Sequence, residues 1–475
     1  MLFNSLDFAV FFPLVFIAYW FIFNKNVRLQ NLFLLLASYL FYACWDWRFV
    51  LLLIASTLVN FYVAKAIAAV NPKRKRTVLW VGIIANLSVL GVFKYLNFFI
   101  DSLNGSYSFF GYGFEISLYT LLLPVGISFY TFQCISYITD VYRGHTDASD
   151  DLQSFLLFVA FFPQLISGPI ERKNHLMPQI ERKRLFDYPM AVNAMRMILL
   201  GLFEKMVIAD NCAPVVAQIY NSYELQSGST LFFGTILYSF QIYGDFSGYS
   251  HMAIGCAGLL GFTLKDNFRY PYLAKNIADF WRRWHMSFSG WLRDYIYFPL
   301  GGSRRGDLVQ IRNLIIVFVI SGIWHGAKWT FVIYGFSHAA LYVAYIYYKK
   351  WNVTHNYISN SKSLQVTGNF IAFGFTFVYL TLARVFFKSS SVTEAIEYLG
   401  LVFSESLLSR PDISRGLILC LFVFLGLECL QRNKKHVLDI SFIRFRVTRY
   451  GIYLFMLLLI AYFSGESDSF IYFRF

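Results

Sequence analysis

The stretch LDFAVFFPLVFIAYWFIF, residues 6–23, decides the fold class of this chain. It is an almost unbroken apolar run, and a helix of roughly 20 such residues spans the ~30 Å hydrocarbon core of a bilayer. Comparable runs recur along the whole chain of 475 residues, of which 57% are apolar and 14% are charged. This composition predicts an all-α integral membrane protein.

The apolar runs and the basic loops between them predict one threading through the membrane. The first run is not expected to be a cleaved signal peptide, because it has Asp7 at its start, no basic residue precedes it, and Lys25 and Arg28 follow it. The positive-inside rule then places the N-terminus outside and the basic loops, including 71–76 and 171–188, in the cytoplasm. About twelve runs are expected to cross. They are residues 6–23, 30–44, 49–70, 77–100, 118–141, 190–213, 230–262, 309–325, 329–348, 367–388, 415–430 and 448–464.

Two further segments must stay on one side of the membrane for this threading to hold. Residues 152–170 are interrupted by Pro163, and residues 281–307 carry five arginines among tryptophans and tyrosines. Irregular backbone at membrane depth is tolerated only where it is buried in protein or lines a cavity, so both segments are predicted to be re-entrant around a cavity open to the cytoplasm. The tail, 464–475, then lies outside, but its side reverses if 152–170 crosses. No linker composition interrupts the pattern, so residues 1–475 are predicted to form a single membrane domain.

The net charge of +14 comes from basic residues in the short loops between apolar runs. Such residues orient a membrane protein and contact anionic lipid, so the expected partner of most of them is membrane lipid and not nucleic acid. The six cysteines show no C-x-x-C spacing, so neither a disulfide framework nor a metal site is predicted.

Ionisable residues inside apolar runs are the candidates for function, because charge at membrane depth is costly. His325, in VISGIWHGAKWTFVIYG, and His285, in the segment 281–307, are the most informative histidines. Each could instead be a structural histidine, in the protein core for His325 and at the membrane interface for His285. Asp245 lies within an apolar run and is expected to hold helices together, and His251 follows six residues later.

These residues suit transfer of an acyl group from a large anionic donor to a hydroxyl. A neutral imidazole can take the proton of an attacking hydroxyl, and a positioned base contributes typically 10²- to 10⁴-fold. Arginines at the cytoplasmic mouth could bind the phosphates of the donor. The candidates are Arg282, Arg283, Arg304 and Arg305. Sequence motifs of serine hydrolases, nucleotide-binding proteins and zinc peptidases are absent from the sequence.

Four motifs together resemble the membrane-bound O-acyltransferase family. They are FFPQLISGPI (161–170), DFSGYSHMAIG (245–255), NFRYPYLAKNIADFWRRWHMSFSGWLRDYIYFPLGGSR (267–304) and SGIWHGAKWTFVIYG (321–335). The sequence is most similar to the bacterial branch that holds the membrane subunits of alginate, cellulose and peptidoglycan O-acetyltransferases and the lipoteichoic acid D-alanyl transferase. The resemblance implies helices around a central tunnel, with His325 as the catalytic residue and His285 as its companion. Gly244 and His251 depart from the family pattern, which has a phenylalanine and a second aspartate there.

The end of the chain, FIYFRF (470–475), is unusually aromatic. It could be an interfacial anchor. In the D-alanyl transferase relatives a separate small protein supplies a similar motif with an acylated tyrosine, so the resemblance implies that Tyr472 is an acyl carrier in a fused tail.

The expected function is therefore O-acetylation of an extracellular or periplasmic polysaccharide, in the inner membrane of a bacterium, with both termini outside. Acetyl-CoA is the expected donor substrate, no permanently bound cofactor or metal is expected, and an extracytoplasmic SGNH-type acyltransferase is the expected partner. Direct transfer to glycan in the tunnel, a carrier-protein donor such as a D-alanyl thioester, and a non-enzymatic transporter remain as alternatives. The sequence does not indicate which polysaccharide is modified.

Overall fold

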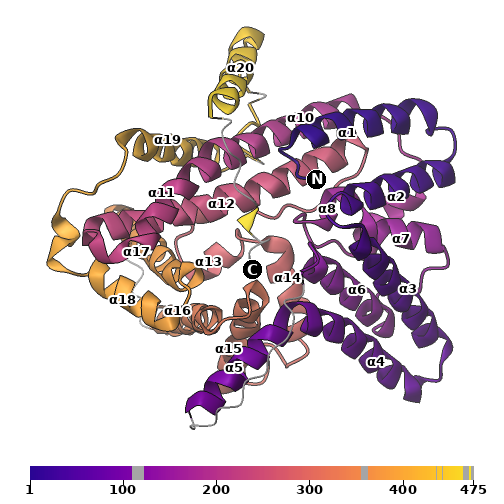
Figure 1. Ribbon diagram of the computed structural model, residues 1–475, viewed down its shortest axis with the longest axis horizontal. Coiled ribbons are helices and arrows are strands. Elements are labelled where there is room, and N and C mark those ends of the chain that lie inside the picture. Colours follow the sequence, from indigo (N-terminus) through magenta and orange to yellow (C-terminus); the bar gives the residue numbers. More distant parts are fainter. Residues whose placement is uncertain (110–121, 355–361, 435, 441, 464–469, 472–475) are drawn as a thin grey trace. The chain divides into compact units, whose positions relative to one another are not determined.

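Every regular element in the described part of the chain is a helix, as the apolar runs predict (Figure 1). The computed structural model describes residues 1–109, 122–354, 362–434, 436–440, 442–463 and 470–471. Among these residues, 6 helices are long and apolar enough to cross a membrane. They are Trp47–Ala69, Pro72–Asn104, Asp307–His325, Trp329–Asn352, Thr367–Lys388 and Arg446–Phe463, and the shorter apolar helices are Leu6–Ile22 and Val27–Ala43.

The described residues form two compact units. The first holds Met1–Ile198 with Met252–Lys265, and the second holds Leu199–His251 with the residues from Asp266 onward. The predicted single domain over residues 1–475 stays a prediction.

The first unit contains the N-terminal helices and the segment 152–170. Its elements are α1 (Leu6–Ile17), a π-helical turn (Ala18–Ile22), α2 (Val27–Ala43), α3 (Trp47–Ala69), α4 (Pro72–Leu90), a second π turn (Gly91–Tyr95), α5 (Leu96–Phe109), α6 (Ile127–Tyr142), α7 (Leu152–Ala160), α8 (Phe162–Leu165), α9 (Lys173–Glu181) and most of α10 (Tyr188–Leu202). Side-chain oxygens of Ser5, Asn26 and Asp46 accept hydrogen bonds from the first turns of α1, α2 and α3, which fixes where these helices begin. The sequence predicts that the chain leaves the helix after residue 100, whereas α5 continues to Phe109.

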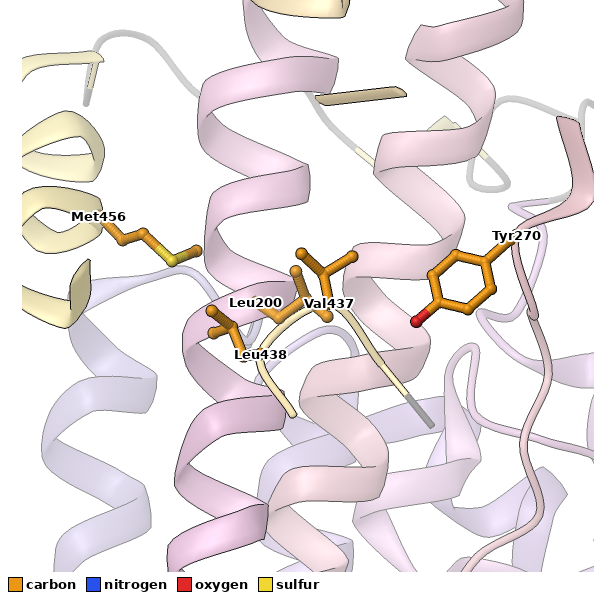
Figure 2. Packing of buried hydrophobic residues seen from close by; sticks show 5 residues of the cluster. All are labelled: Leu200, Tyr270, Val437, Leu438 and Met456. Carbon is orange, nitrogen blue, oxygen red and sulfur yellow. The ribbon is translucent and has the colours of Figure 1, made fainter. Parts of the chain in front are cut away.

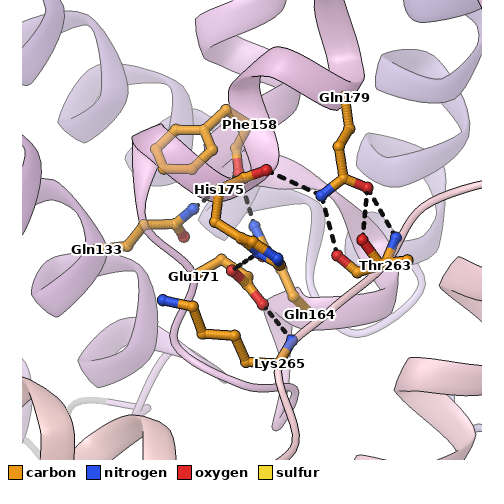
Figure 3. Close-up of polar contacts among 8 residues, drawn as sticks. All are labelled: Gln133, Phe158, Gln164, Glu171, His175, Gln179, Thr263 and Lys265. Carbon is orange, nitrogen blue, oxygen red and sulfur yellow. Dashed lines mark hydrogen bonds and ion pairs between the residues drawn. The ribbon is translucent and has the colours of Figure 1, made fainter. Parts of the chain in front are cut away.

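The segment 152–170 breaks after Ala160 and is almost wholly buried. Figure 3 shows the polar contacts around Phe158 and Glu171. Side-chain amides of Gln133 and Gln164 donate to the Phe158 carbonyl at 2.9 and 2.6 Å, which satisfies one backbone oxygen exposed by the break. Farther along, the Glu171 carboxylate accepts hydrogen bonds from the Lys265 backbone and the His175 ring, both at 2.6 Å. The broken backbone is thus paired inside protein, as its predicted position requires.

The second unit contains the remaining helices. They are a π turn (Phe203–Ala209), α11 (Asp210–Asn221), a 3₁₀ turn (Tyr223–Leu225), most of α12 (Gly228–Leu259), a 3₁₀ turn (Pro271–Leu273), α13 (Ile277–Trp281), α14 (Met286–Leu292), a π turn (Arg293–Tyr297), α15 (Asp307–His325), α16 (Trp329–Thr354), α17 (Lys362–Lys388), α18 (Val392–Val402), a 3₁₀ turn (Glu405–Leu408), α19 (Arg415–Gln431) and α20 (Arg446–Phe463).

A small apolar cluster ties the loop after α19 to the rest of the second unit (Figure 2). Its buried members are Leu200, Tyr270, Val437, Leu438 and Met456. Val437 and Leu438 come from the loop, Leu200 from α10 and Met456 from α20. Their burial stabilises the loop in place, at roughly 1.5–3 kcal/mol for each fully buried large side chain.

Candidate active site

His285 lies at the start of α14, where the chain turns sharply out of α13. It adopts the left-handed conformation, with φ 44° and ψ 54°, which is costly for a residue with a Cβ. Two backbone hydrogen bonds hold this turn against the strand-like segment before it, from Met286 N–H to the Asn267 carbonyl and from Arg269 N–H to the Arg283 carbonyl, both 2.9 Å. Strained backbone of this kind persists where surrounding structure fixes it, and it occurs often at functional sites.

The His285 side chain is 0% exposed and is surrounded by aromatic rings. Its ring centroid lies 4.7 Å from that of Phe246, 5.0 Å from Phe288 and 5.5 Å from Trp324. Burial lowers the pKa of the His285 imidazole to about 3, because the charged form is poorly solvated. The imidazole is therefore neutral at pH 7, the form that can accept a proton or a hydrogen bond.

His325 is the last residue of α15, and Gly326 after it is extended. Its ring centroid lies 4.9 Å from Trp324, 5.0 Å from Phe387 and 6.3 Å from Phe288. Trp324 and Phe288 therefore contact both histidines. The structure brings the two predicted residues into one buried aromatic site, although they are forty positions apart in the sequence.

Close approach of α15 and α16 sets the position of His325. A Cβ at Gly322 would overlap the backbone carbonyl of Phe331 in α16. Only glycine permits this spacing, since it places no side-chain atom between the two helices. The helix that ends at His325 is thereby fixed against its neighbour.

Asp245 contacts both Lys205 and the backbone of Ile471, whereas the sequence predicts only that it holds helices together. Its carboxylate lies 2.7 Å from Lys205 Nζ, which also contacts Asp210 at 2.7 Å. The other carboxylate oxygen accepts a hydrogen bond from the Ile471 backbone N–H at 2.7 Å. A second-unit helix, α12, therefore binds the C-terminal segment directly.

Phe470, the residue before Ile471, is buried beside the same helix. Its ring centroid is 4.4 Å from Tyr249 and 6.1 Å from Phe246, and Phe246 in turn contacts His285. Phe246 thus contacts both Phe470 and His285. Tyr472, the predicted acyl carrier, lies outside the described residues.

The two residues that depart from the family pattern, Gly244 and His251, both lie against Glu204. The His251 ring Nδ1 and the Ser247 hydroxyl contact the same Glu204 oxygen at 2.7 and 2.8 Å. A Cβ at Gly244 would lie 2.6 Å from the Glu204 carbonyl oxygen, so a phenylalanine there would collide with this turn. His251 consequently serves as a partner for a buried carboxylate.

Of the four candidate arginines, Arg282, Arg304 and Arg305 are exposed, whereas Arg283 is half-buried. Arg282 and Arg283 both contact Asp279, at 3.5 and 3.1 Å. Arg304 and Arg305 are exposed in the loop before α15. The exposed positions are compatible with binding of a soluble anion, and the role stays a prediction.

Sequence reasoning missed several buried polar residues near the site. His338 is buried, and Tyr334 lies between it and His325, with centroids 4.5 Å from the first and 6.2 Å from the second. Arg384 is also buried and lies over the rings of Tyr272 and Trp284, at 5.1 and 5.0 Å. Arg384 lies within the apolar run 367–388, so its charge at membrane depth was the signal that could have identified it.

Comparison with known proteins agrees with the resemblance that the motifs indicate. A model of the family described as MBOAT, membrane-bound O-acyltransferase, matches residues 145–390. The chain is 36% identical over 450 residues to the probable alginate O-acetylase AlgI of Pseudomonas putida, a match that covers 92% of this chain and 89% of that protein. It is 36% identical over 430 residues to the peptidoglycan O-acetyltransferase of Helicobacter pylori, covering 84% of this chain and 79% of that protein. It is 28% identical over 279 residues to the teichoic acid D-alanyltransferase of Bacillus subtilis, covering 54% and 69%.

The family model matches more than half of the chain, and the identities to these relatives extend over most of it. Together they assign the chain to one protein family. The chain belongs to the membrane-bound O-acyltransferase family.

Proposed function

We propose that this protein moves an acetyl group from cytoplasmic acetyl-CoA across the bacterial inner membrane, for O-acetylation of a polysaccharide outside the cytoplasm. The observation that carries the proposal is the pair of buried histidines sharing Phe288 and Trp324, with Phe470 packed against Phe246, which contacts His285. Relatives named for O-acetylation of alginate and of peptidoglycan support the acyl group and the class of acceptor.

His325 acts as the general base in this mechanism. Its imidazole takes the proton of an attacking hydroxyl, whose oxygen forms a bond to the thioester carbonyl carbon. The carbon–sulfur bond then breaks, and coenzyme A leaves as the thiol after taking a proton. Neutral His285 lies beside the same two rings and orients the reacting groups by hydrogen bonding.

Tyr472 supplies the attacking hydroxyl in the proposed relay. The hydrogen bond from Ile471 to Asp245 and the burial of Phe470 support it, because they fix the residues directly before Tyr472 next to Phe246. A phenol with pKa near 10 is a better leaving group than an alcohol, so a tyrosine ester is suited to pass the acetyl group on. An extracytoplasmic acyltransferase of the SGNH type would accept it and transfer it to the glycan.

The proposed topology has about twelve crossings around a central tunnel, with both termini outside. The distribution of basic loops supports it, together with the six long apolar helices found among the described residues. Donor phosphates would bind the arginines at the cytoplasmic mouth, among them Arg304 and Arg305, which are exposed.

The test is turnover of acetyl-CoA by the purified full-length protein in detergent. Free thiol is followed for the wild type, for His325→Ala and for His436→Gln, a buried histidine in the loop after α19. Thiol release that falls by at least 10²-fold in His325→Ala and persists in His436→Gln is expected for loss of a general base. Absence of turnover in the wild type, or equal turnover in the three proteins, would favour a transporter or a different donor.

A further inference from the structure

A pocket of about 600 Å³ lies in the first unit, away from the two histidines in the sequence. It is formed by the end of α1 with its π turn, by the loop before α2, and by the linker between α9 and α10. A volume of this size is within the range of ligand-binding pockets, about 300–1,000 Å³. π-helical turns such as Ala18–Ile22 often occur at functional positions.

Arg184 lines this pocket and is only 7% exposed. Its guanidinium donates to neutral acceptors alone: the Tyr19 hydroxyl at 2.8 Å, the Gln30 and Asn31 side chains at 2.7 and 2.8 Å, and backbone carbonyls that include Ile180 at 2.6 Å. Within the described residues no carboxylate forms an ion pair with it. The guanidinium is therefore held by several hydrogen bonds, while no carboxylate among the described residues compensates its charge, which is costly for a buried ion.

The rim adds two more positive charges. Lys25 and Lys183 line the pocket with exposed side chains, and none of the described lining residues is acidic. Neither lysine forms an ion pair in the described part of the chain. An anion bound here would be attracted by three cations and repelled by no lining carboxylate.

The walls are apolar and partly open. Phe21 is 75% exposed and Leu185 is 76% exposed, while Phe186 packs edge-on against Trp20 at 5.5 Å. A free inorganic anion would leave these apolar side chains uncovered. An occupant that combines a phosphate with hydrocarbon would satisfy both the basic rim and the apolar walls. Trp20 is also of the residue type found at headgroup depth.

We infer that this pocket binds an anionic phospholipid, with the headgroup phosphate between Lys25 and Lys183 above Arg184 and an acyl chain along Phe21 and Leu185. The headgroup phosphate supplies a negative charge near Arg184, which has no ion-pair partner among the described residues. The lipid also fixes the linker between α9 and α10. This site is independent of the proposed function, because none of its residues belongs to the histidine site.

The test uses the full-length protein in nanodiscs of phosphatidylcholine with a minor fraction of phosphatidylglycerol, followed by native mass spectrometry of retained lipid. The variant is Lys25→Gln with Lys183→Gln. The control is Lys73→Gln with Lys75→Gln, which removes the same charge from the first turn of α4 in the first unit. Each basic residue near anionic lipid contributes about fivefold to affinity, so the variant is expected to lose phosphatidylglycerol by about 20- to 30-fold and the control by less than twofold.

Three results would overturn the inference. The first is equal retention of phosphatidylglycerol in the variant and the wild type, and the second is equal loss in the variant and the control. The third is displacement of the lipid by inorganic phosphate, glycerophosphoglycerol or coenzyme A at millimolar concentration, which would make the pocket a site for soluble anions. Both lysines are exposed and make no hydrogen bond in the described part of the chain, so the variant is expected to fold, and an unchanged melting midpoint in zwitterionic detergent verifies this.

Discussion

Removal of the Asp245 carboxylate should release the C-terminal segment from α12. The carboxylate accepts the Ile471 N–H at 2.7 Å, and a hydrogen bond to a charged group contributes about 1.5–3 kcal/mol. A loss of about 2 kcal/mol in Asp245→Ala corresponds to about a 30-fold shift toward the released state. Asp245→Asn keeps a neutral acceptor, so the expected loss is about 1 kcal/mol, or about fivefold. The protein should still fold, because Lys205 keeps Asp210 as a partner at 2.7 Å.

The assay is hydrogen exchange of the Ile471 amide, resolved by mass spectrometry of C-terminal peptides. Exchange should quicken in the order wild type, Asp245→Asn, Asp245→Ala. Ser250→Ala is the control, since this buried hydroxyl lies on the same helix and makes no hydrogen bond among the described residues. The reasoning is refuted if Ile471 exchanges at the unprotected rate in the wild type, or if the control quickens exchange as much as Asp245→Ala.

Three further predictions concern stability. Burial lowers the pKa of His285 in the folded state, so protonation favours unfolding as pH falls below about 6.5. Between pH 7 and 5 the free energy of unfolding of the wild type should fall by about 2 kcal/mol more than that of His285→Gln, as measured by chemical denaturation in detergent. Gly322→Ala should lower the thermal midpoint because its Cβ would meet the Phe331 carbonyl, whereas Gly374→Ala, with open space around it, should not. His251→Asn should lower the free energy of unfolding by about 3–5 kcal/mol, because the Glu204 carboxylate loses its ring partner. Adding Glu204→Gln should restore part of that stability. Equal destabilisation in the single and double variants would contradict the pairing.

The apolar runs were sufficient to predict most of the helices, because a run of apolar residues in a membrane protein can satisfy its backbone only as a helix. The break in 152–170 was also predicted, from Pro163. The continuation of α5 to Phe109 was not predicted. Polar residues such as Asn104 end an apolar run without ending a helix, since helix propensity and apolar patterning are different signals.

The site was predicted in part. His285 and His325 were identified by unusual context and by resemblance to a family, and the structure places both against Trp324. The pairing of Asp245 with Lys205 and with the Ile471 backbone depends on contacts between residues far apart in the chain, and no local pattern encodes them. Such contacts are fixed only by tertiary packing.

Transfer of label from acetyl-CoA to Tyr472 would distinguish the relay from direct acetylation of the glycan. Purified protein is incubated with isotopically labelled acetyl-CoA, and its peptides are analysed by mass spectrometry. The variants are His325→Ala, Tyr472→Phe and, as a matched control, Tyr462→Phe, an exposed tyrosine on α20. The account predicts label on the tail peptide of the wild type and of Tyr462→Phe, and none in the other two. Label that persists on the tail of Tyr472→Phe, or its absence from a wild type that still consumes acetyl-CoA, would contradict the relay.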